Sequence, residues 1–197
     1  MRKLIDSQEN PVDNINVHLS DKLCPVFKYL GFNPNDITTL SLFFGVISII
    51  LLATGHPWWF ACTYYISYFF DCMDGHFARR YSMVSKGGDY YDHIKDVFIG
   101  LGVLGVVFYR HSRSHSIITI IVAILIYSIC ILLMLAHLGC QEKISNNQDS
   151  ASLESLKILC PEDAEKNIKY TRWFGCGTFI LITIFFIIYL EIYDVSE

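Results

Sequence analysis

Long apolar runs separated by short polar links dominate the chain from residue 37 onward. A helix of about 20 apolar residues, rising 1.5 Å per residue, crosses the hydrocarbon core of a bilayer. Five runs fit this pattern: residues 37–54, 58–70 (continuing as a polar helix to about residue 79), 87–109, 116–138 and 173–190. The pattern predicts an all-α fold, a polytopic membrane helix bundle with five apparent transmembrane helices.

The pattern is different before the first span. Residues 1–12 form a polar tail, and between Asp13 and Leu30 apolar residues recur at helical spacing. This predicts an amphipathic helix that lies either on the membrane surface or against the protein itself. We therefore expect residues 1–33 to form a cytoplasmic tail with an amphipathic interfacial helix, and residues 34–197 to form the transmembrane domain.

Composition and charge support a membrane protein and set its orientation. The chain is 53% hydrophobic and 17% charged, with a mean hydropathy of +0.39, which excludes an ordinary soluble domain. A net charge of −4 argues against a nucleic-acid partner. Thirteen of the fifteen Lys and Arg residues fall on the side that holds residues 71–96, against Arg110 and Arg113 on the other. This asymmetry places residues 71–96 at the cytoplasmic face.

The polar stretch 139–171 separates the last two spans. Leu153, Leu156 and Leu159 favour one short surface helix within it. The seven cysteines are scattered, and free, mostly buried thiols are the expected state. A disulfide between Cys140 and Cys160 requires an oxidising compartment, so a cytoplasmic position of this loop argues against it.

Four acidic residues interrupt the apolar pattern between the second and third spans: Asp71, Asp74, Asp92 and Asp96. At about 100° per residue, each pair falls on one face of its helix. Four carboxylates that lie close together at a membrane interface must be neutralised by cations. Oxygen ligands suit hard divalent cations, so we expect Mg²⁺ or Mn²⁺ here, with two ions clamping a diphosphate.

Neighbouring residues on the same faces suit a phosphate ligand. Arg79 is a planar donor for phosphate oxygens, and Gly75 and Ala78 leave room for a ligand close to the backbone. Either Asp96 or Asp92 could act as a base toward an incoming hydroxyl. These residues predict phosphoryl transfer from a diphosphate at the cytoplasmic face of a membrane.

The same residues resemble a known signature. The run Asp71-x-x-Asp74-Gly75-x-x-Ala78-Arg79, followed after eight residues by Gly88-x-x-x-Asp92-x-x-x-Asp96, resembles that of the CDP-alcohol phosphotransferase (CDP-alcohol phosphatidyltransferase) family. Upstream, Pro34-Asn35-x-x-Thr38 resembles the segment that opens the first span in that family.

The resemblance implies an enzyme of phospholipid biosynthesis that displaces CMP from a CDP-linked donor by the hydroxyl of a lipid or polar alcohol. It implies metal ligation by Asp71, Asp74, Asp92 and Asp96, with Asp92 and Asp96 catalytic. It also implies substrate binding by Gly75, Ala78, Arg79, Gly88, Asn35 and Thr38. Members usually form homodimers with six spans, one more than this chain shows.

The identity of the alcohol depends largely on His93. The sequence Gly88-x-x-x-Asp92-His93 resembles the branch that joins CDP-choline or CDP-ethanolamine to diacylglycerol, which we favour; the alternative is a transferase that uses CDP-diacylglycerol with inositol, serine or glycerol phosphate. The expected membrane is the endoplasmic reticulum in a eukaryote or the inner membrane in a bacterium. A cation-binding transporter and a non-catalytic membrane protein are the alternatives from other classes.

Overall fold

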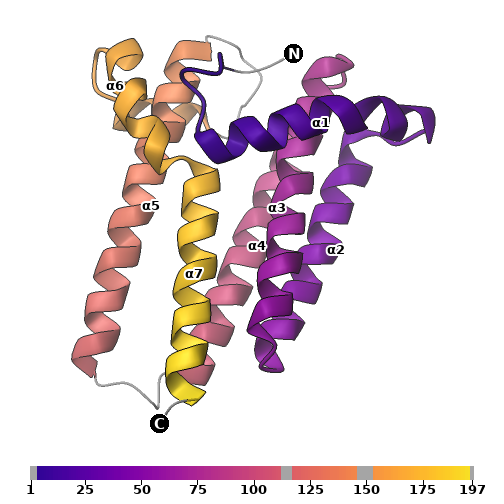
Figure 1. Cartoon of the computed structure of the whole chain (residues 1–197). Helices are drawn as coiled ribbons and strands as arrows, with labels where there is room; N and C mark the ends of the chain where they lie inside the picture. The colour runs from indigo at the N-terminus through magenta and orange to yellow at the C-terminus, as the bar shows by residue number, and fades with distance from the viewer. Residues whose placement is uncertain (1–3, 112–116, 146–152, 196–197) are drawn as a thin grey trace.

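The computed structural model describes residues 4–111, 117–145 and 153–195. Its five long helices run roughly parallel to one another (Figure 1). They are α2 (Pro34–Ala53), α3 (Pro57–Arg80), α4 (Lys86–His111), α5 (Ile117–Ser145) and α7 (Cys176–Val195). The predicted amphipathic helix is present as α1 (Pro11–Tyr29) and lies across one end of the bundle. The all-α helix bundle is thereby confirmed.

Short helices cover the same end of the bundle as α1. They are the 3-10 helix η1 (Glu154–Leu159), α6 (Ala164–Thr171) and the single turn η2 (Arg172–Phe174). The sequence predicted one surface helix here and missed α6; it also ended the fourth span at residue 138, whereas α5 continues to Ser145. Among the described residues no sixth long helix runs along the bundle, because α1 lies across its end.

Local chemistry explains where the first helices begin. The Asn10 side chain accepts hydrogen bonds from the backbone of Val12 and Asp13 at the start of α1. Asn33 and Asp36 form a reciprocal capping box at the start of α2. Between α1 and α2 the chain turns at Gly31, whose φ of +83° is unstrained only for glycine.

Three helical stretches of the described chain are long and apolar enough to cross a membrane: Pro34–Ala53, Ile124–Ser145 and Ala164–Ile192. Large apolar side chains such as Phe43, Leu132 and Phe185 face outward from these stretches, as expected for contact with lipid. The chain is an integral membrane protein, and α3 and α4, which carry the acidic residues, lie in the same bundle (Figure 1).

Close contacts among α2, α3 and α4 fix the frame of the site. Ser41 Oγ donates to the Ser67 carbonyl at 2.9 Å, and Ser67 Oγ donates to the Ser41 carbonyl at 2.8 Å, so α2 and α3 approach without unpaired hydroxyls. At Gly45 a Cβ would lie 2.7 Å from Ile99 Cδ1. These small residues allow α4 to pack closely on α2, as small residues do in membrane helix pairs.

Candidate active site

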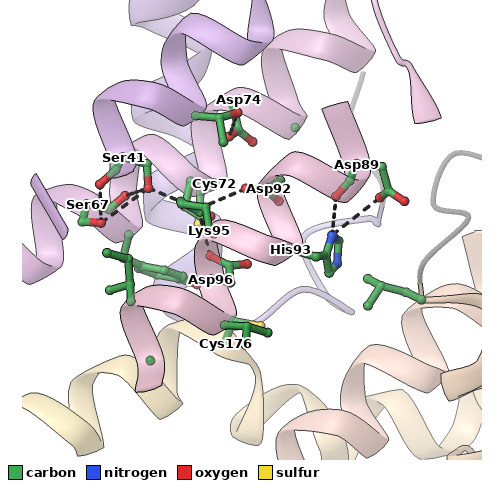
Figure 2. Close-up of a pocket in the computed structure, with 18 of the residues that line it drawn as sticks. Ser41, Ser67, Cys72, Asp74, Asp89, Asp92, His93, Lys95, Asp96 and Cys176 are labelled. Carbon is green, nitrogen blue, oxygen red and sulfur yellow. Dashed lines mark hydrogen bonds and ion pairs between the residues drawn. The ribbon is translucent and has the colours of Figure 1, made fainter. Parts of the chain in front are cut away.

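A cavity of about 690 Å³ opens between the long helices, near the end that α1 covers. One part of its wall is polar and comes from α2, α3 and the first turns of α4 (Figure 2). The remaining wall is apolar and includes side chains of α4, α5 and α7. The cavity therefore joins a charged compartment to an apolar one, which suits a ligand with a polar head and an apolar tail.

The four predicted carboxylates line the polar compartment. Asp71 and Asp74 lie one turn apart on α3, and Asp92 and Asp96 lie one turn apart on α4. Oxygen atoms of Asp71, Asp74 and Asp92 all lie within 4.8 Å of one another. Asp96 is outside this group of three and has a side chain that is 49% exposed. The structure thus brings together the residues that the helical spacing predicted, but in unequal positions.

A buried hydrogen bond holds Asp74. Thr38 Oγ1 on α2 donates to Asp74 Oδ2 at 2.6 Å, and Thr38 and Asp74 are only 2% and 5% exposed. The resemblance implied that Thr38 binds substrate. Thr38 lines the cavity, and its hydroxyl also holds a carboxylate of the acidic group in position.

Lys95 occupies the centre of the acidic group (Figure 2). Its Nζ forms ion pairs with Asp71, with Asp92 Oδ1 at 3.0 Å and with Asp96 Oδ1 at 2.8 Å. The same atom donates to Ser41 Oγ at 3.2 Å, and the residue is 3% exposed. Lys95 was not among the site residues predicted from the sequence. Its position about 60° from Asp92 around the helix was the signal that could have found it.

The donor set fits a divalent cation. Three carboxylates with oxygens within 4.8 Å of one another match the type of ligand that Mg²⁺ and Mn²⁺ prefer. Asp92 Oδ1 is buried and accepts no hydrogen bond of good geometry within the described part of the chain, although Lys95 Nζ lies 3.0 Å away. A buried carboxylate oxygen in this state is available as a ligand.

The other predicted substrate residues surround the carboxylates. A Cβ built at Gly75 would lie 3.2 Å from Arg79 Nη1, so the guanidinium lies against this glycine. A Cβ at Gly88 would lie 3.0 Å from Asn35 Oδ1, which places α2 and α4 in close contact there. Ala78 also lines the cavity. These contacts place a planar guanidinium beside the acidic group, and a guanidinium is suited to bind a diphosphate.

His93 lies at the edge of the cavity beside Asp89 (Figure 2). Its Nδ1 lies 2.7 Å from the Asp89 carbonyl oxygen and 3.8 Å from Asp89 Oδ1. The Asp89 side chain is 12% exposed. This pair orients the ring of His93 toward the first turn of its own helix rather than into the group of carboxylates.

The wall opposite the carboxylates is apolar. On α4 it includes Leu101 and Leu104, and on α5 it includes Ile131, Met134 and Leu135. Leu101 is 65% exposed and Leu104 is 40% exposed, so this wall continues onto the apolar exterior of the bundle. Nothing in the sequence alone indicated that α5 would face the acidic helices across a cavity.

A titratable group on α1 lies behind the polar wall. Tyr68, which lines the cavity, donates a hydrogen bond to Asp13. The pKa of Asp13 is raised to about 7, chiefly by burial; the Tyr68 hydrogen bond opposes this rise, and the negative charge of Glu9 adds to it. Helix α1 is thereby tied to α3 through a carboxyl group that titrates near neutral pH.

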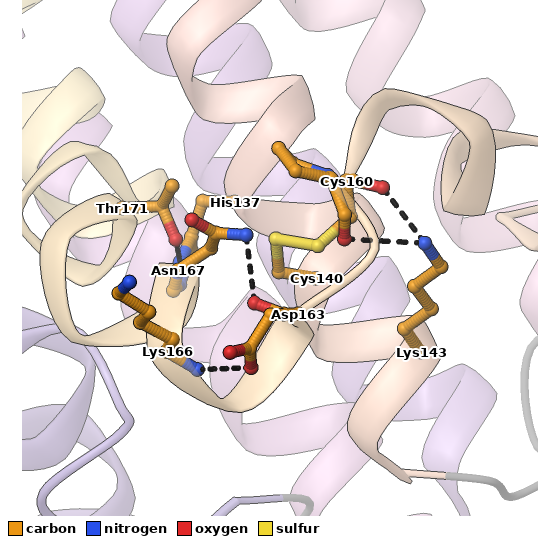
Figure 3. The surroundings of a disulfide bond; sticks show 9 residues. His137, Cys140, Lys143, Cys160, Asp163, Lys166, Asn167 and Thr171 are labelled. Carbon is orange, nitrogen blue, oxygen red and sulfur yellow. Dashed lines mark hydrogen bonds between the residues drawn. A yellow bond between two sulfur atoms is a disulfide. The ribbon is translucent and has the colours of Figure 1, made fainter.

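A disulfide joins α5 to the residue that ends η1, contrary to the expectation from the sequence. Cys140 and Cys160 are joined, with Cα atoms 4.9 Å apart, and Lys143 Nζ donates to the Cys160 carbonyl at 2.8 Å (Figure 3). The expectation of free thiols was wrong here because α5 extends past residue 138 and η1 folds back against it. A Cβ at Gly139 would lie 2.2 Å from the Leu156 carbonyl oxygen. This contact brings the two cysteines within bonding range.

The fold and the cavity define a class: a membrane-embedded helical protein with an acidic centre at one end of its bundle. A family model described as CDP-alcohol phosphatidyltransferase matches residues 32–195, and the chain belongs to this family. Comparisons with curated proteins and with solved structures give no match. Membership supports a transferase of phosphate groups in phospholipid synthesis, and the family uses divalent metals.

Proposed function

We propose that this protein transfers a substituted phosphate group from a CDP-linked donor to the hydroxyl of an alcohol and releases CMP. The observation that carries the proposal is the group formed by Asp71, Asp74 and Asp92, with oxygens within 4.8 Å of one another at the polar end of the cavity. When bound there, a divalent cation would neutralise charge on the diphosphate and stabilise the leaving CMP.

The remaining residues receive roles from their positions. Arg79 donates to phosphate oxygens, and Gly75, Ala78, Gly88 and Asn35 form the wall against which the CDP group lies. Asp96 is the most exposed of the four carboxylates, so it can reach the acceptor hydroxyl and accept its proton. The phosphorus–oxygen bond to the acceptor forms as the bond to CMP breaks, and the hydroxyl proton passes to Asp96.

The acceptor is an uncharged alcohol. The described residues that line the cavity include two cations, Arg79 and Lys95, and Lys95 is paired with carboxylates. A phosphorylated acceptor would need additional Arg or Lys side chains. The apolar wall on α4 and α5 suits acyl chains, which supports CDP-choline or CDP-ethanolamine with diacylglycerol. The alternative with matching chemistry is CDP-diacylglycerol with an uncharged polar alcohol such as inositol.

The site faces the cytoplasm in this proposal. Thirteen of fifteen Lys and Arg residues favour that orientation, whereas the Cys140–Cys160 disulfide at the same end favours an oxidising compartment. We give more weight to the charges because they set topology during insertion. A cysteine introduced at the exposed residue Ser82 tests this: a membrane-impermeant maleimide should label it only in inside-out vesicles. We also propose the homodimer that is usual in the family.

A donor panel tests the reaction. Purified protein with Mg²⁺ or Mn²⁺ is incubated with CDP-choline, CDP-ethanolamine or CDP-diacylglycerol and candidate alcohols, and CMP release is measured. We expect metal-dependent release with one donor class. Absence of release with every donor–acceptor pair would refute the proposal.

Matched variants connect the activity to the site. Asp92→Asn and Asp96→Asn should each lower turnover by about 10²-fold or more, because each removes several kcal/mol of charge stabilisation or the proton acceptor. Glu165→Gln, which changes an exposed carboxylate on α6, should leave turnover unchanged. Near-normal turnover in the two aspartate variants would show that these carboxylates are wrongly assigned.

A further inference from the structure

We propose that Lys95 takes the place of a second metal ion, so that the acidic centre binds one divalent cation together with one built-in ammonium group. This inference rests on the metal-dependent function proposed above and changes the expectation of two ions. It assigns Lys95 a role in determining the metal content of the site.

The contacts of Lys95 carry the inference. Its Nζ pairs with Asp71, Asp92 and Asp96 and also contacts Ser41 Oγ, so four oxygens surround one nitrogen. Such a cage is the coordination that a cation shared between α3 and α4 would have. Among the described residues, Asp74 is the one carboxylate of the four that forms no ion pair with Lys95. It accepts a hydrogen bond from Thr38.

Two distinct cation positions follow from these contacts. Asp74 together with Asp71 and Asp92 provides the first, where the three carboxylates converge. Asp96 is not part of the group whose oxygens all lie within 4.8 Å of one another, so a second ion would bind between Asp96 and the oxygens of Asp71 and Asp92. Lys95 Nζ already occupies that position.

Displacing Lys95 would be costly. The residue is 3% exposed, with Ser41 beside its Nζ and Ile99 buried one turn further along α4. A buried ammonium that loses its carboxylate partners keeps the cost of desolvation without the compensating attraction. A divalent cation and an ammonium within a few ångströms would also repel each other. The site therefore accepts one ion at the three-carboxylate position and retains Lys95.

Mn²⁺ binding to the wild-type protein provides the first test. In detergent at saturating Mn²⁺, we expect one tightly bound ion per chain by equilibrium binding. Its electron paramagnetic resonance spectrum should be that of an isolated ion. Two ions sharing carboxylates would lie about 3.5–4 Å apart and would give a spectrum broadened by spin coupling. Two bound ions in the wild-type protein would overturn the inference, and this measurement does not depend on the folding of any variant.

Variants of Lys95 provide the second test. Lys95→Met removes the ammonium and should raise the content from one Mn²⁺ to two, whereas Lys95→Arg, which keeps the charge, should still bind one. The double variant Lys95→Met/Asp96→Asn should return to one ion, because the second position loses its own carboxylate. Lys86→Met, which alters an exposed lysine on the same helix, is the matched control and should bind one ion.

The outcomes separate this inference from the proposed function. If thermal unfolding shows that Lys95→Met is folded and this variant does not bind a second Mn²⁺, the role of Lys95 is overturned. Absence of Mn²⁺ from both proteins also overturns it. One Mn²⁺ in the wild-type protein and two in Lys95→Met support the role of Lys95, even if no donor releases CMP, in which case only the proposed reaction fails.

Discussion

The hydrogen bond from Thr38 to Asp74 should control how tightly the acidic centre binds its metal. The substitution Thr38→Val replaces the hydroxyl by a methyl group of similar size and removes the donor at 2.6 Å from Asp74 Oδ2. Both residues are at most 5% exposed, so water cannot readily replace the lost donor. Asp74 would then keep its place on α3 but lose the contact that orients its carboxylate.

The expected magnitude follows from the chemistry of this bond. A hydrogen bond to a charged group contributes about 1.5–3 kcal/mol, and a buried acceptor left unsatisfied lies at the upper end of that range. At about 1.4 kcal/mol per factor of ten, this corresponds to a 10- to 100-fold weaker metal affinity. Loss of a group that orients a metal ligand typically has the same effect, about 10- to 100-fold.

Mn²⁺ titration of wild-type, Thr38→Val and Thr38→Ser proteins in detergent measures the effect. We expect the Kd for Mn²⁺ to rise 10- to 100-fold in Thr38→Val, and to stay near the wild-type value in Thr38→Ser, which keeps the hydroxyl. Thr39→Val is the matched control, because the neighbouring Thr39 is exposed and its hydroxyl bonds to the Asn35 carbonyl. Turnover of Thr38→Val should recover at high Mn²⁺.

A Kd for Thr38→Val within twofold of the wild-type value, in a protein with normal thermal unfolding, would refute the reasoning. It would mean that Asp74 is oriented by other contacts or does not bind the metal. A loss of turnover that high Mn²⁺ does not restore would instead show that Thr38 contacts the substrate, as the resemblance implied.

Two further predictions concern stability. Burial raises the pKa of Asp13 from 3.8 to about 7, so stability should fall as the pH rises through that window, because the folded state holds a proton that the unfolded state has lost. The thermal stability of Asp13→Asn minus that of the wild-type protein should therefore be larger at pH 8 than at pH 5. An equal difference at both pH values would contradict this prediction. Cys140→Ala should lower the free energy of unfolding by about 3 kcal/mol, given the sequence separation of 20 residues between Cys140 and Cys160. The same change at the exposed free thiol Cys62 is the control, and a reductant that leaves wild-type unfolding unchanged would show that the bond contributes nothing.

The helices and the acidic residues of the site could be predicted from the sequence because both depend on local periodicity. Apolar runs of membrane length indicated α2, α5 and α7, and the spacing of Asp71 with Asp74 and of Asp92 with Asp96 placed each pair on one helix face. The structure confirms that these faces meet. The sequence predicted five spans, one fewer than is usual in the family, because it contains five long apolar runs. Among the described residues, three helical stretches are long and apolar enough to cross a membrane.

Contacts between residues distant in the sequence were decided only by the tertiary structure. Thr38 meets Asp74 across 36 residues and Lys95 meets Ser41 across 54, because α2 packs in close register with α3 and α4. No local period encodes that register, so the sequence could not show that Lys95 reaches Asp71 on α3 and Ser41 on α2. The Cys140–Cys160 disulfide likewise required η1 to fold back on α5. The sequence by itself therefore determined which carboxylates the centre contains, and helix packing determined which other residues contact them.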